Sequence, residues 1–418
     1  MNFNSNLSNN IITEYKFDVD LKPNLNYWAN SPVKVEENLT DLKLNKPFQI
    51  IPNEIVLNKM NNFINSHPYK LDYKVNDKNL DLNILCNFIN ENYIDELDST
   101  HKFLYSVDLL EYYTSDSLVI SFYSKQNEFH KSKMIGLIIG KKSNLFINNF
   151  EFTCADANFL ILNPKVRNKN LAPLIISILT KELIINYSIA IAHYTINNPI
   201  KAPHYCLKYY YHRMINIDKL FETKFISSDI SSINDYKQLY NNFKNYLPNQ
   251  NILYMNKINT KEVSNELIDL IYQNINSYAK KKYMIYEYRT KEQIKKMFNC
   301  ESFHHFFLLE LNHEKNKNII KNYMCINELK TLNTENNKYY LNGYIYTGFY
   351  SDSVNIVIEK ISEYIYSNNI LDTLTWNDFF DVENSCTLAI KGSGFLKYYL
   401  YNIQTSEIPN ELNGLVTL

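Results

Sequence analysis

The chain has 418 residues, which is long for one domain and comfortable for two. Its formal net charge is −1, with 43 Lys and Arg against 44 Asp and Glu, so composition gives no reason to expect nucleic acid or an anionic membrane surface as a partner. No apolar run approaches the roughly 20 residues that a membrane-spanning helix needs, which argues against an integral membrane protein.

The amino-terminal residues are polar and rich in Asn, and we expect residues 1–20 to form a mobile tail without a secretory signal. Behind them Tyr27 and Trp28 form an aromatic pair, which either pins this terminus to another part of the protein or packs on the domain surface. The six cysteines are scattered without a C-x-x-C pair, a pattern typical of reduced, mostly buried thiols. These features favour a cytoplasmic protein.

Residues 81–97 carry apolar side chains at helical spacing, and the predicted helix runs into acidic residues Asp95, Glu96 and Asp98. This cluster fits either a solvated loop or a pocket for a basic ligand. Apolar, β-branched segments then predict a sheet. Its strands are expected at residues 118–123, 134–139, 145–152 and 158–162, followed by a helix at 171–187 and a strand at 189–195.

The turn between the strand at 158–162 and the helix at 171–187 contains Arg167 and Lys169. The first N–H groups of a helix are unpaired and carry the positive end of the helix dipole, so an anion is stabilised there. Pro173 suits the first helical turn, where its missing N–H costs nothing. The pattern predicts either a phosphate-binding turn or an ordinary basic surface loop.

The same order of elements recurs after a polar stretch at about residues 225–250. Apolar residues at helical spacing recur near 263–271, 294–297 and 354–365, while 305–311, 339–346, 371–376 and 396–403 are strand-like. Each half therefore has helices, strands, a long helix and a strand. This repetition predicts two similar α/β halves that could share one sheet.

Other candidate sites are weak. The adjacent His304 and His305 are poor joint metal ligands, because neighbouring side chains on a strand face opposite ways. No metal site is expected, and no Ser or Cys stands with a His in a nucleophile signature. Gly392 and Gly394 precede a predicted strand. They indicate a tight turn, or a backbone that needs positive φ or a close approach.

Several segments carry a family resemblance. Residues 158–173 are N-F-L-I-L-N-P-K-V-R-N-K-N-L-A-P, 210–213 are Y-Y-H-R, and 392–402 are G-S-G-F-L-K-Y-Y-L-Y-N. With E-N-Y at 91–93, F-L-Y-S at 103–106, Y-T at 194–195 and N-G-L-V-T-L at 413–418, they keep one order along the chain. Together they resemble motifs of the glycylpeptide N-tetradecanoyltransferase (N-myristoyltransferase) family, among them N-F-L-C-V-H-x-x-L-R-S-K-R-L-A-P and G-D-G-N-L-Q-Y-Y-L-Y-N.

The resemblance implies an α/β fold of two pseudo-symmetric halves, each like a GCN5-related acetyltransferase, around one saddle-shaped mixed sheet. The amino half (residues 21–220) would hold acyl-CoA, and the carboxyl half (residues 221–418) would supply most of the peptide groove. The implied reaction moves myristate from myristoyl-CoA, a co-substrate and not a resident cofactor, to the amine of an N-terminal glycine. A monomer is expected.

The resemblance assigns the catalytic base to the terminal carboxylate of Leu418. An α-carboxyl titrates near ~3.5 and is therefore ionised at pH 7. Asn158 and Thr195 match positions that help to hold the glycine amine. The backbone N–H groups of Phe159 and Leu160 match the oxyanion hole, which stabilises the thioester oxygen as it becomes negative.

The resemblance also implies binding positions for both substrates. Those for acyl-CoA, where the turn grips the phosphates and an aromatic pair covers the ligand, are Tyr27, Trp28, Arg167, Asn168, Lys169, Asn170, Leu171 and Ala172. Those for the peptide, in a covering loop that favours a downstream Lys and in the groove, are Tyr93, Asp95, Glu96, Phe103, His212, Tyr344 and Gly394.

Four positions depart from the family pattern. Asn170 replaces a basic residue, Leu97 an acidic one and Ser393 an Asp, and these bear on substrate selection more than on catalysis. Ile196 beside Thr195 could crowd the first peptide positions. Three hypotheses therefore stay open: an active N-myristoyltransferase, a related acyltransferase with another acyl or peptide preference, and a non-catalytic acyl-CoA- or peptide-binding homologue. The third hypothesis is disfavoured because a protein that only binds would not need Asn158, Thr195 and a C-terminal Leu.

Overall fold

A computed structural model describes residues 46–76, 80–93, 100–124, 133–167, 169–197, 200, 204–226, 233–241, 253–257, 263–300, 304–311, 320–351, 353–377, 388–405 and 408–416. Side chains are described in all of these except residues 253–257, 304 and 308–311. The expected tail lies outside the described residues, as do the predicted site positions Tyr27, Trp28, Asp95, Glu96, Asn168 and Leu418.

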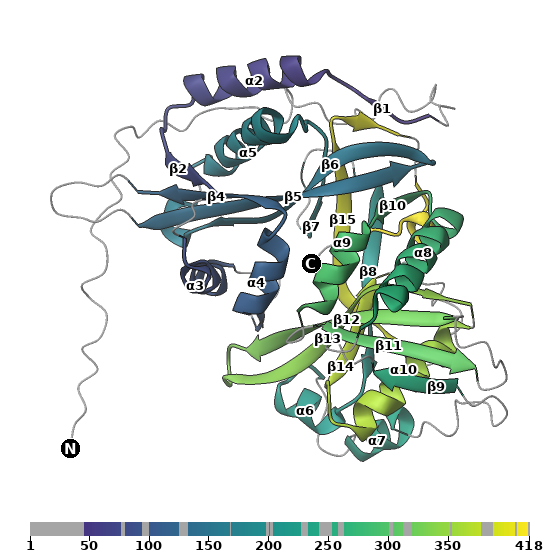
Figure 1. The fold of residues 1–418 in the computed structure, drawn as a ribbon. Coiled ribbons are helices and arrows are strands. Elements are labelled where there is room, and N and C mark those ends of the chain that lie inside the picture. The colour runs from purple at the N-terminus through teal and green to yellow at the C-terminus, as the bar shows by residue number, and fades with distance from the viewer. Residues whose placement is uncertain are drawn as a thin grey trace, which may run out of the picture.

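The described chain contains both helices and strands, with several strands following one another directly (Figure 1). The helices are α2 (Asn53–Ser66), α3 (Leu82–Asn92), α4 (Val107–Thr114), η2 (Pro164–Val166), α5 (Leu171–Tyr187), α6 (Ile217–Glu222), α7 (Ile233–Tyr240), α8 (Asn265–Lys282), α9 (Lys291–Phe298), α10 (Val354–Ser367) and η6 (Asn410–Leu412). The strands are β1 (Phe48–Gln49), β2 (Asp72–Val75), β3 (His101–Leu104), β4 (Ser117–Tyr123), β5 (Met134–Ile147), β6 (Phe150–Leu162), β7 (Ala192–Ile196), β8 (Cys206–Met214), β9 (Leu253–Lys257), β10 (Ile285–Tyr288), β11 (His304–Leu311), β12 (Asn322–Asn333), β13 (Lys338–Tyr350), β14 (Thr373–Asn377), β15 (Ile390–Tyr401) and β16 (Ile403–Gln404).

One mixed sheet of 14 strands runs through the described molecule, with the main path β2-β4-β5-β6-β7-β15-β8-β14-β13-β12-β11-β9. β10 pairs with β5 and β3 pairs with β12, while β1 and β16 form a separate pair. In Figure 1 the long pair β5–β6 lies in the upper part and β12–β13 in the lower part, with β7, β15 and β8 between them. The predicted α/β class with one shared sheet is confirmed.

Each half contains the same crossover unit. In the first crossover unit, antiparallel β5 and β6 are followed by α5 and then by β7, which runs parallel to β6. In the second crossover unit, antiparallel β12 and β13 are followed by α10 and then by β14, parallel to β13. Parallel neighbours require such a connection across one face of the sheet. The repeated order of elements expected from the sequence is therefore present in three dimensions.

The two halves exchange strands. β15 lies between β7 and β8, and β8 lies between β15 and β14. The first crossover unit is thus extended by a strand from the carboxyl half, and the second by a strand from the amino half. The sheet crosses the expected boundary near residue 220, and the two domain ranges remain a prediction.

Helix α5 positions the turn that precedes it. Leu171, Leu174 and Ile175 are buried with side chains of β4 and β5, and the helix also packs against α2. This double burial explains why apolar residues occupy most of its circumference. The helix begins after Asn170 and ends before Ser188, and both flanking residues have left-handed backbone conformations. The predicted helix at 171–187 is confirmed at both ends.

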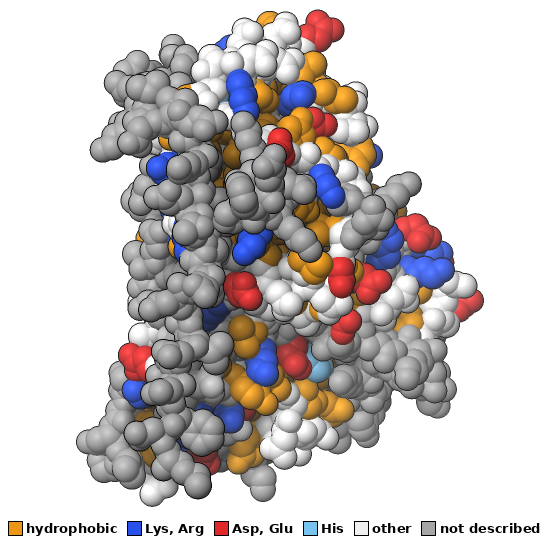
Figure 2. Space-filling view, turned by 90° about the vertical axis from the view of Figure 1, so that its left-hand side faces the viewer, with side chains coloured by type: hydrophobic (Ala, Val, Ile, Leu, Met, Phe, Trp, Pro, Cys, Tyr) orange, Lys and Arg blue, Asp and Glu red, His pale blue; other side chains and the backbone are white. Residues whose placement is uncertain are grey.

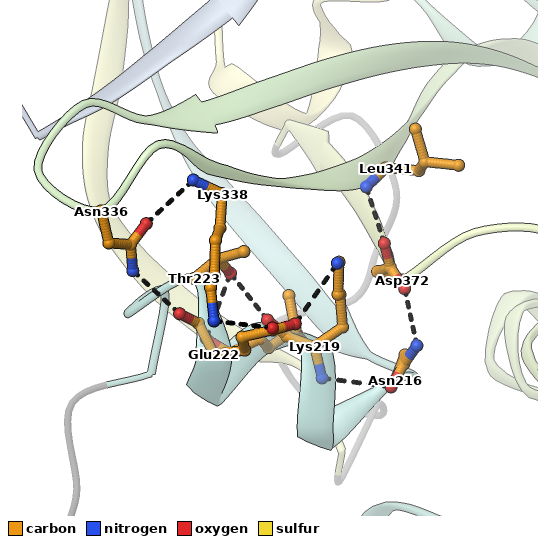
Figure 3. Close-up of polar contacts among 9 residues, drawn as sticks. Asn216, Lys219, Glu222, Thr223, Asn336, Lys338, Leu341 and Asp372 are labelled. Atoms are coloured by element: carbon orange, nitrogen blue, oxygen red, sulfur yellow. Dashed lines mark hydrogen bonds and ion pairs between the residues drawn. The ribbon is translucent and has the colours of Figure 1, made fainter.

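Helix α6 follows β8 and is fastened to the second crossover unit (Figure 3). Lys338 of β13 donates to the carboxylate of Glu222 at 2.8 Å. Asp372, just before β14, accepts from the backbone N–H of Leu341 at 2.7 Å and from Nδ2 of Asn216 at 2.8 Å. These contacts come from three separate segments, so they fix the end of β8 against β13 and β14.

Most other predicted elements are present with shifted ends. The predicted helix at 81–97 is α3, which ends at Asn92. The predicted strand at 145–152 was wrong as one strand, because the turn at Asn148 and Asn149 divides it between β5 and β6. Among the long strands, the sequence analysis did not predict β8 or β12.

The distribution of charged side chains and the state of the cysteines can be compared with the expectations from composition. Figure 2 shows Lys and Arg interspersed with Asp, Glu and hydrophobic side chains on the described part of one face. The five cysteines within the described ranges are free, and four of them are buried. None of the helices in these ranges is long and apolar enough to cross a membrane.

Candidate active site

The two predicted amine-binding residues lie on neighbouring parallel strands. Ala155 of β6 pairs with Ala192 of β7, and Asp156 pairs with His193, but the parallel pairing continues no further. Asn158 is three residues beyond Ala155, and Thr195 is three residues beyond Ala192. By this count the two residues occupy equivalent positions on the two strands, just beyond the point where the pairing stops. Their joint role in holding an amine stays a prediction.

A bulge in β6 follows directly. The register with β5 shifts so that Phe159 and Leu160 together face one residue of β5. Such a bulge releases backbone groups from the regular ladder. Phe159 has φ 51°, in the left-handed region that bulky residues rarely occupy. Its ring makes edge-on contacts with Tyr105 and Tyr113, at 5.1 and 5.3 Å between centroids.

The N–H of Phe159 donates to Oδ1 of Asn158 at 2.8 Å. The predicted oxyanion donor and the predicted amine-binding side chain are therefore already in contact. Leu160 is 41% exposed, so its part of the bulge is accessible. An oxyanion hole requires backbone N–H groups that can donate to a carbonyl oxygen, and that role for Phe159 and Leu160 stays a prediction.

Below Asn158 lies a row of polar residues that the sequence analysis missed. Lys141 of β5, Asp156 of β6 and His193 of β7 are register partners across three strands. The hydroxyl of Tyr113 donates to Oδ2 of Asp156 at 2.8 Å, and Nδ1 of His193 is 3.8 Å from Oδ1 of Asp156. Charged residues inside apolar strands were the available signal, because they are rarely buried without partners.

The carboxyl-terminal segment runs into this region. Leu415 and Val416 line a cavity of about one water molecule together with Tyr113, Asp156 and His193. The segment is held through its backbone: Gly414 N–H donates to Ile285 O at 2.8 Å, and Nζ of buried Lys208 donates to Asn413 O. Leu418 itself lies outside the described residues, so its predicted role is untested.

The turn before α5 joins β6 to the helix N-terminus. Nε of Arg167 donates to Leu162 O at 3.1 Å, and its NH2 group donates to Asn92 O at 2.7 Å. Arg167 therefore fastens the turn to the end of α3. The side chain of Asn170 makes no capping hydrogen bond to α5, which leaves the first N–H groups of that helix uncapped by it. Lys169, Leu171 and Ala172 lie at the same helix end.

Two predicted peptide residues lie near α3 and β3. Tyr93 follows the last residue of α3, and its ring makes an edge-on contact with that of Tyr105 at 5.8 Å. Phe103 is on β3, where it pairs with Thr331 of β12 and is 39% exposed. Because Tyr105 also contacts Phe159, Tyr93 is connected to the bulge through one intervening ring.

The other predicted peptide positions, His212, Tyr344 and Gly394, lie on β8, β13 and β15. Ile390 pairs with His212, and the β15–β8 register shifts between Lys391 and Phe395, around the two glycines. A Cβ on Gly392 would stand 2.6 Å from Nε2 of His212, and one on Gly394 would stand 3.0 Å from the Tyr210 ring. The glycines lie inside β15, and no glycine in the described ranges has positive φ. The tight-turn interpretation was wrong, and close approach is the reason for both glycines.

His212 has a defined protonation pattern. Thr375 donates its hydroxyl proton to Asn342 Oδ1 at 2.7 Å, so it must accept from Nδ1 of His212 at 2.9 Å. Burial lowers the pKa of His212 to about 4, which keeps it neutral at pH 7. Nε2 therefore faces Gly392 as an acceptor. Tyr344, buried on β13, lies near this group through the edge-on contact of its ring with Tyr210 at 6.3 Å.

No group of three His, Cys, Asp or Glu residues suited to a metal occurs in the described part of the chain. The site instead combines diverging parallel strands, a bulge with accessible backbone and a helix N-terminus in one crossover unit. Together with its repetition around one sheet, this defines the fold as GCN5-related acyltransferase-like in two halves.

The comparisons with known proteins agree with this class. The family described as "Myristoyl-CoA:protein N-myristoyltransferase, N-terminal domain" matches residues 52–206. A glycylpeptide N-tetradecanoyltransferase of Plasmodium falciparum is 25% identical over 417 residues, covering 96% of this chain and 95% of the relative. One of Candida albicans is 25% identical over 371 residues, covering 79% and 74%. The chain is therefore similar to N-myristoyltransferases in sequence, through residues 52–206 for the family's N-terminal domain and over most of its length for these two relatives.

The fold is similar to that of Saccharomyces cerevisiae N-myristoyltransferase with bound myristoyl-CoA. The TM-score is 0.72 at 18% sequence identity, and the match covers 94% of each chain. At this identity the likeness supports the fold. The family and the fold therefore agree with what the motifs implied, while the role of each site residue remains a prediction.

Proposed function

We propose that this chain transfers the myristoyl group from myristoyl-CoA to the amine of an N-terminal glycine. The similarity to N-myristoyltransferases over most of the chain supports this acyltransferase activity. The observation that carries the proposal is the separation of β6 and β7 beside the bulge. Asn158 and Thr195 occupy equivalent positions beyond the last pair of these strands, and the N–H of Phe159 in the bulge contacts Asn158, which supports the proposal.

The reaction removes two protons from the glycine ammonium as the C–N bond forms and the C–S bond breaks. One proton ends on the sulfur of CoA and the other is released. In our proposal the terminal carboxylate of Leu418 takes the first proton, and the neutral amine then attacks the thioester carbonyl. Two residues extend at most about 7 Å beyond Val416, which itself lines the cavity beside Asp156.

The developing oxyanion would be stabilised by the N–H groups of Phe159 and Leu160. Because the N–H of Phe159 donates to Asn158 in the free protein, the thioester oxygen must share or replace that bond. The phosphates of CoA would lie at the N-terminus of α5, where the helix dipole and Lys169 favour negative charge. Arg167 contributes by holding the turn against α3.

The peptide groove would run past Tyr93, Phe103, His212 and Tyr344. A neutral His212 supports this, because its Nε2 is an acceptor for a hydroxyl or N–H of the peptide. Gly394 and its neighbour Gly392 keep β15 free of side chains beside Tyr210 and His212. A side chain at either glycine would occupy space next to those rings.

The test is an acyl-transfer assay with myristoyl-CoA and a peptide that begins with Gly-Ser or Gly-Asn. Amide product is expected with the free amine, and none with the same peptide acetylated at its amine. A series of acyl-CoA chain lengths separates the alternatives: a maximum at another length indicates a related acyltransferase. Tight acyl-CoA binding without product from any glycine peptide would indicate a non-catalytic homologue and contradict the proposal.

The base assignment is tested at the carboxyl terminus. Deleting Leu418, or extending the chain beyond it, should lower kcat at least a hundredfold while the Kd for acyl-CoA stays unchanged, because the terminal carboxylate is displaced from the amine. Single-turnover rates and acyl-CoA binding by calorimetry measure the two quantities. Full activity in an extended protein would exclude the terminal carboxylate as the base.

A further inference from the structure

We propose that Lys208 and Tyr398 are positioning residues for the carboxyl terminus, and that they hold the backbone of residues 413–415 so that the terminal carboxylate reaches the glycine amine. The inference rests on the proposed function, in which that carboxylate is the base. Neither residue is among the site positions that the sequence motifs imply. We call the pair the terminal clamp, because it acts on the last residues of the chain and not on the substrate.

The first contact of the terminal clamp comes from a buried cation. Lys208 of β8 is fully buried, and its Nζ donates to the backbone oxygen of Asn413, which is buried as well. An ammonium is strongly hydrated, so burying it is unfavourable unless it gains strong partners. A hydrogen bond from a charged donor is about twice as strong as one from a neutral donor. A buried Lys at this carbonyl therefore indicates that the backbone is held tightly here.

The second contact comes from the neighbouring strand. Tyr398 of β15 is fully buried, and its hydroxyl donates to Leu415 O at 3.3 Å. The same hydroxyl accepts from Nδ2 of buried Asn377 on β14 at 3.1 Å. The terminal clamp thus binds two carbonyls that are two residues apart. Its side chains come from the central strands, where the two halves of the sheet exchange strands.

The other backbone contacts of this segment point the same way. The N–H of Gly414 donates to Ile285 O at 2.8 Å, and the N–H of Leu415 donates to Oδ1 of Asn413 at 2.9 Å. A Cβ on Gly414 would stand 2.3 Å from the ring of Tyr283, so the segment passes too close for a side chain. Residues 413–415 are therefore attached to β8, β10 and β15 at once.

The terminal clamp ends close to the proposed reaction site. Leu415 and Val416 line the cavity beside Asp156. The three residues that follow Leu415 span at most about 11 Å. A base acts only within hydrogen-bonding reach of the proton it takes, and a misplacement of about 1 Å can lower a rate about a hundredfold. Fixing the carbonyl of Leu415 therefore limits the positions that the terminal carboxylate can take.

A double-mutant cycle in the acyl-transfer assay tests the inference. Lys208→Met keeps the length of the side chain and removes the ammonium. It should lower kcat about tenfold and leave the Kd for myristoyl-CoA unchanged. Tyr398→Phe should lower kcat about threefold. In a protein that lacks Leu418, either substitution should change kcat less than about twofold, because the carboxylate that the terminal clamp positions is already displaced.

Hydrogen exchange gives a second readout that does not depend on activity. The N–H groups of Gly414 and Leu415 should exchange about tenfold faster in Lys208→Met than in the wild type, because their segment opens more easily. Tyr205→Phe is the matched control. It removes a buried hydroxyl that lies beside Tyr398 and has no hydrogen-bond partner in the described part of the chain. Its kcat and exchange rates should stay within about twofold of the wild type.

Thermal unfolding checks that each variant is folded at the assay temperature. If Lys208→Met does not fold, Tyr398→Phe decides both readouts, with exchange about threefold faster than in the wild type. Unchanged exchange, unchanged kcat, or losses that multiply in the protein that lacks Leu418 would overturn the inference, while wild-type transfer leaves the proposed function standing. A folded wild type that transfers nothing would overturn the proposed function and the terminal clamp's role in it.

Discussion

The two crossover units share one plan and differ at the bulge of their second strand. In the first unit, Phe159 takes a left-handed conformation where β6 leaves the register of β5. In the second unit, the register of β12 with β13 shifts around Tyr346, which is absent from the positive-φ residues of the described ranges and is buried. The guanidinium carbon of Arg289 lies 4.9 Å from the centroid of the Tyr346 ring in a cation–π contact.

The turns that precede α5 and α10 also differ, in the charge of their side chains. Arg167 and Lys169 precede α5, whereas Ser351 and Ser353 are the described residues just before α10. Both bulges bury an aromatic side chain, but only the first has a left-handed residue, the 41% exposed Leu160 and a basic turn before its helix. The comparison teaches that the scaffold shared by the two units does not by itself make the proposed acyl-transfer site. A strained bulge and a basic turn, added to one copy, are what distinguish it.

The largest expected effect tests the strain at the first bulge. Phe159→Ala should lower the free energy of unfolding by about 4 kcal/mol, because the ring packed between Tyr105 and Tyr113 is lost. Phe159→Gly should be about 1 kcal/mol more stable than Phe159→Ala, because glycine accepts positive φ. Urea unfolding of both variants measures the order.

Tyr346 supplies the control for that order. Tyr346→Ala should be more stable than Tyr346→Gly by about 0.5–1 kcal/mol, as in an ordinary strand. The same order at both positions would mean that the two bulges are alike in backbone strain, and the comparison between the units would fail.

The next effect concerns His212, which is bonded to Thr375 of the second unit. Burial lowers its pKa to about 4, against about 6.5 in the unfolded chain. Between these values the unfolded chain binds a proton that the folded chain does not. Stability is therefore lost as pH falls from 6.5 to 4, by up to about 3 kcal/mol from this residue.

The measurement is the free energy of unfolding at pH 7 and pH 4.5. His212→Gln should lose less of its free energy of unfolding between pH 7 and pH 4.5 than the wild type does, by up to about 3 kcal/mol. The control His204→Gln, at an exposed position, should lose as much as the wild type. An unchanged decrease in His212→Gln would show that this histidine is not held neutral by the second unit.

The smallest effect concerns the basic turn of the first unit. Lys169→Ala should raise the Kd for CoA about tenfold at low salt, since one cation beside a phosphate is lost. Lys165→Ala removes an exposed lysine from the same turn and should change the Kd less than twofold. Calorimetry with CoA gives both values. Equal effects would mean that the turn attracts CoA only through general charge.

The sequence was most informative where local rules decide the structure. The apolar periodicity at 171–187 gave α5 its correct ends, because burial against both α2 and the sheet makes nearly every position apolar. The sequence motifs pointed to Asn158 and Thr195, and the strand register shows that they occupy equivalent positions on β6 and β7. Gly392 and Gly394 were recognised as unusual, but only the β15–β8 pairing shows which side chains they admit.

Other features depend on contacts between distant segments. β8 was missed because Lys208 and Arg213 interrupt its apolar pattern, although both are fully buried. Arg213 can be buried because Glu359, far along the chain, accepts from it at 3.0 and 2.9 Å. The contact between Tyr113 and Asp156 likewise has no local sequence signal. It depends on the pairing of β6 with β5 and on the position of α4.

The central position of β15 has a consequence for biosynthesis. Every other strand of the main sheet emerges from the ribosome before β15 does, yet β7 and β8 meet only through it. During translation both strands present unsatisfied edges, which are templates for misassociation. Nascent chains stalled upstream of residue 390 should need chaperone protection, and the mature sheet closes only after synthesis has passed that point.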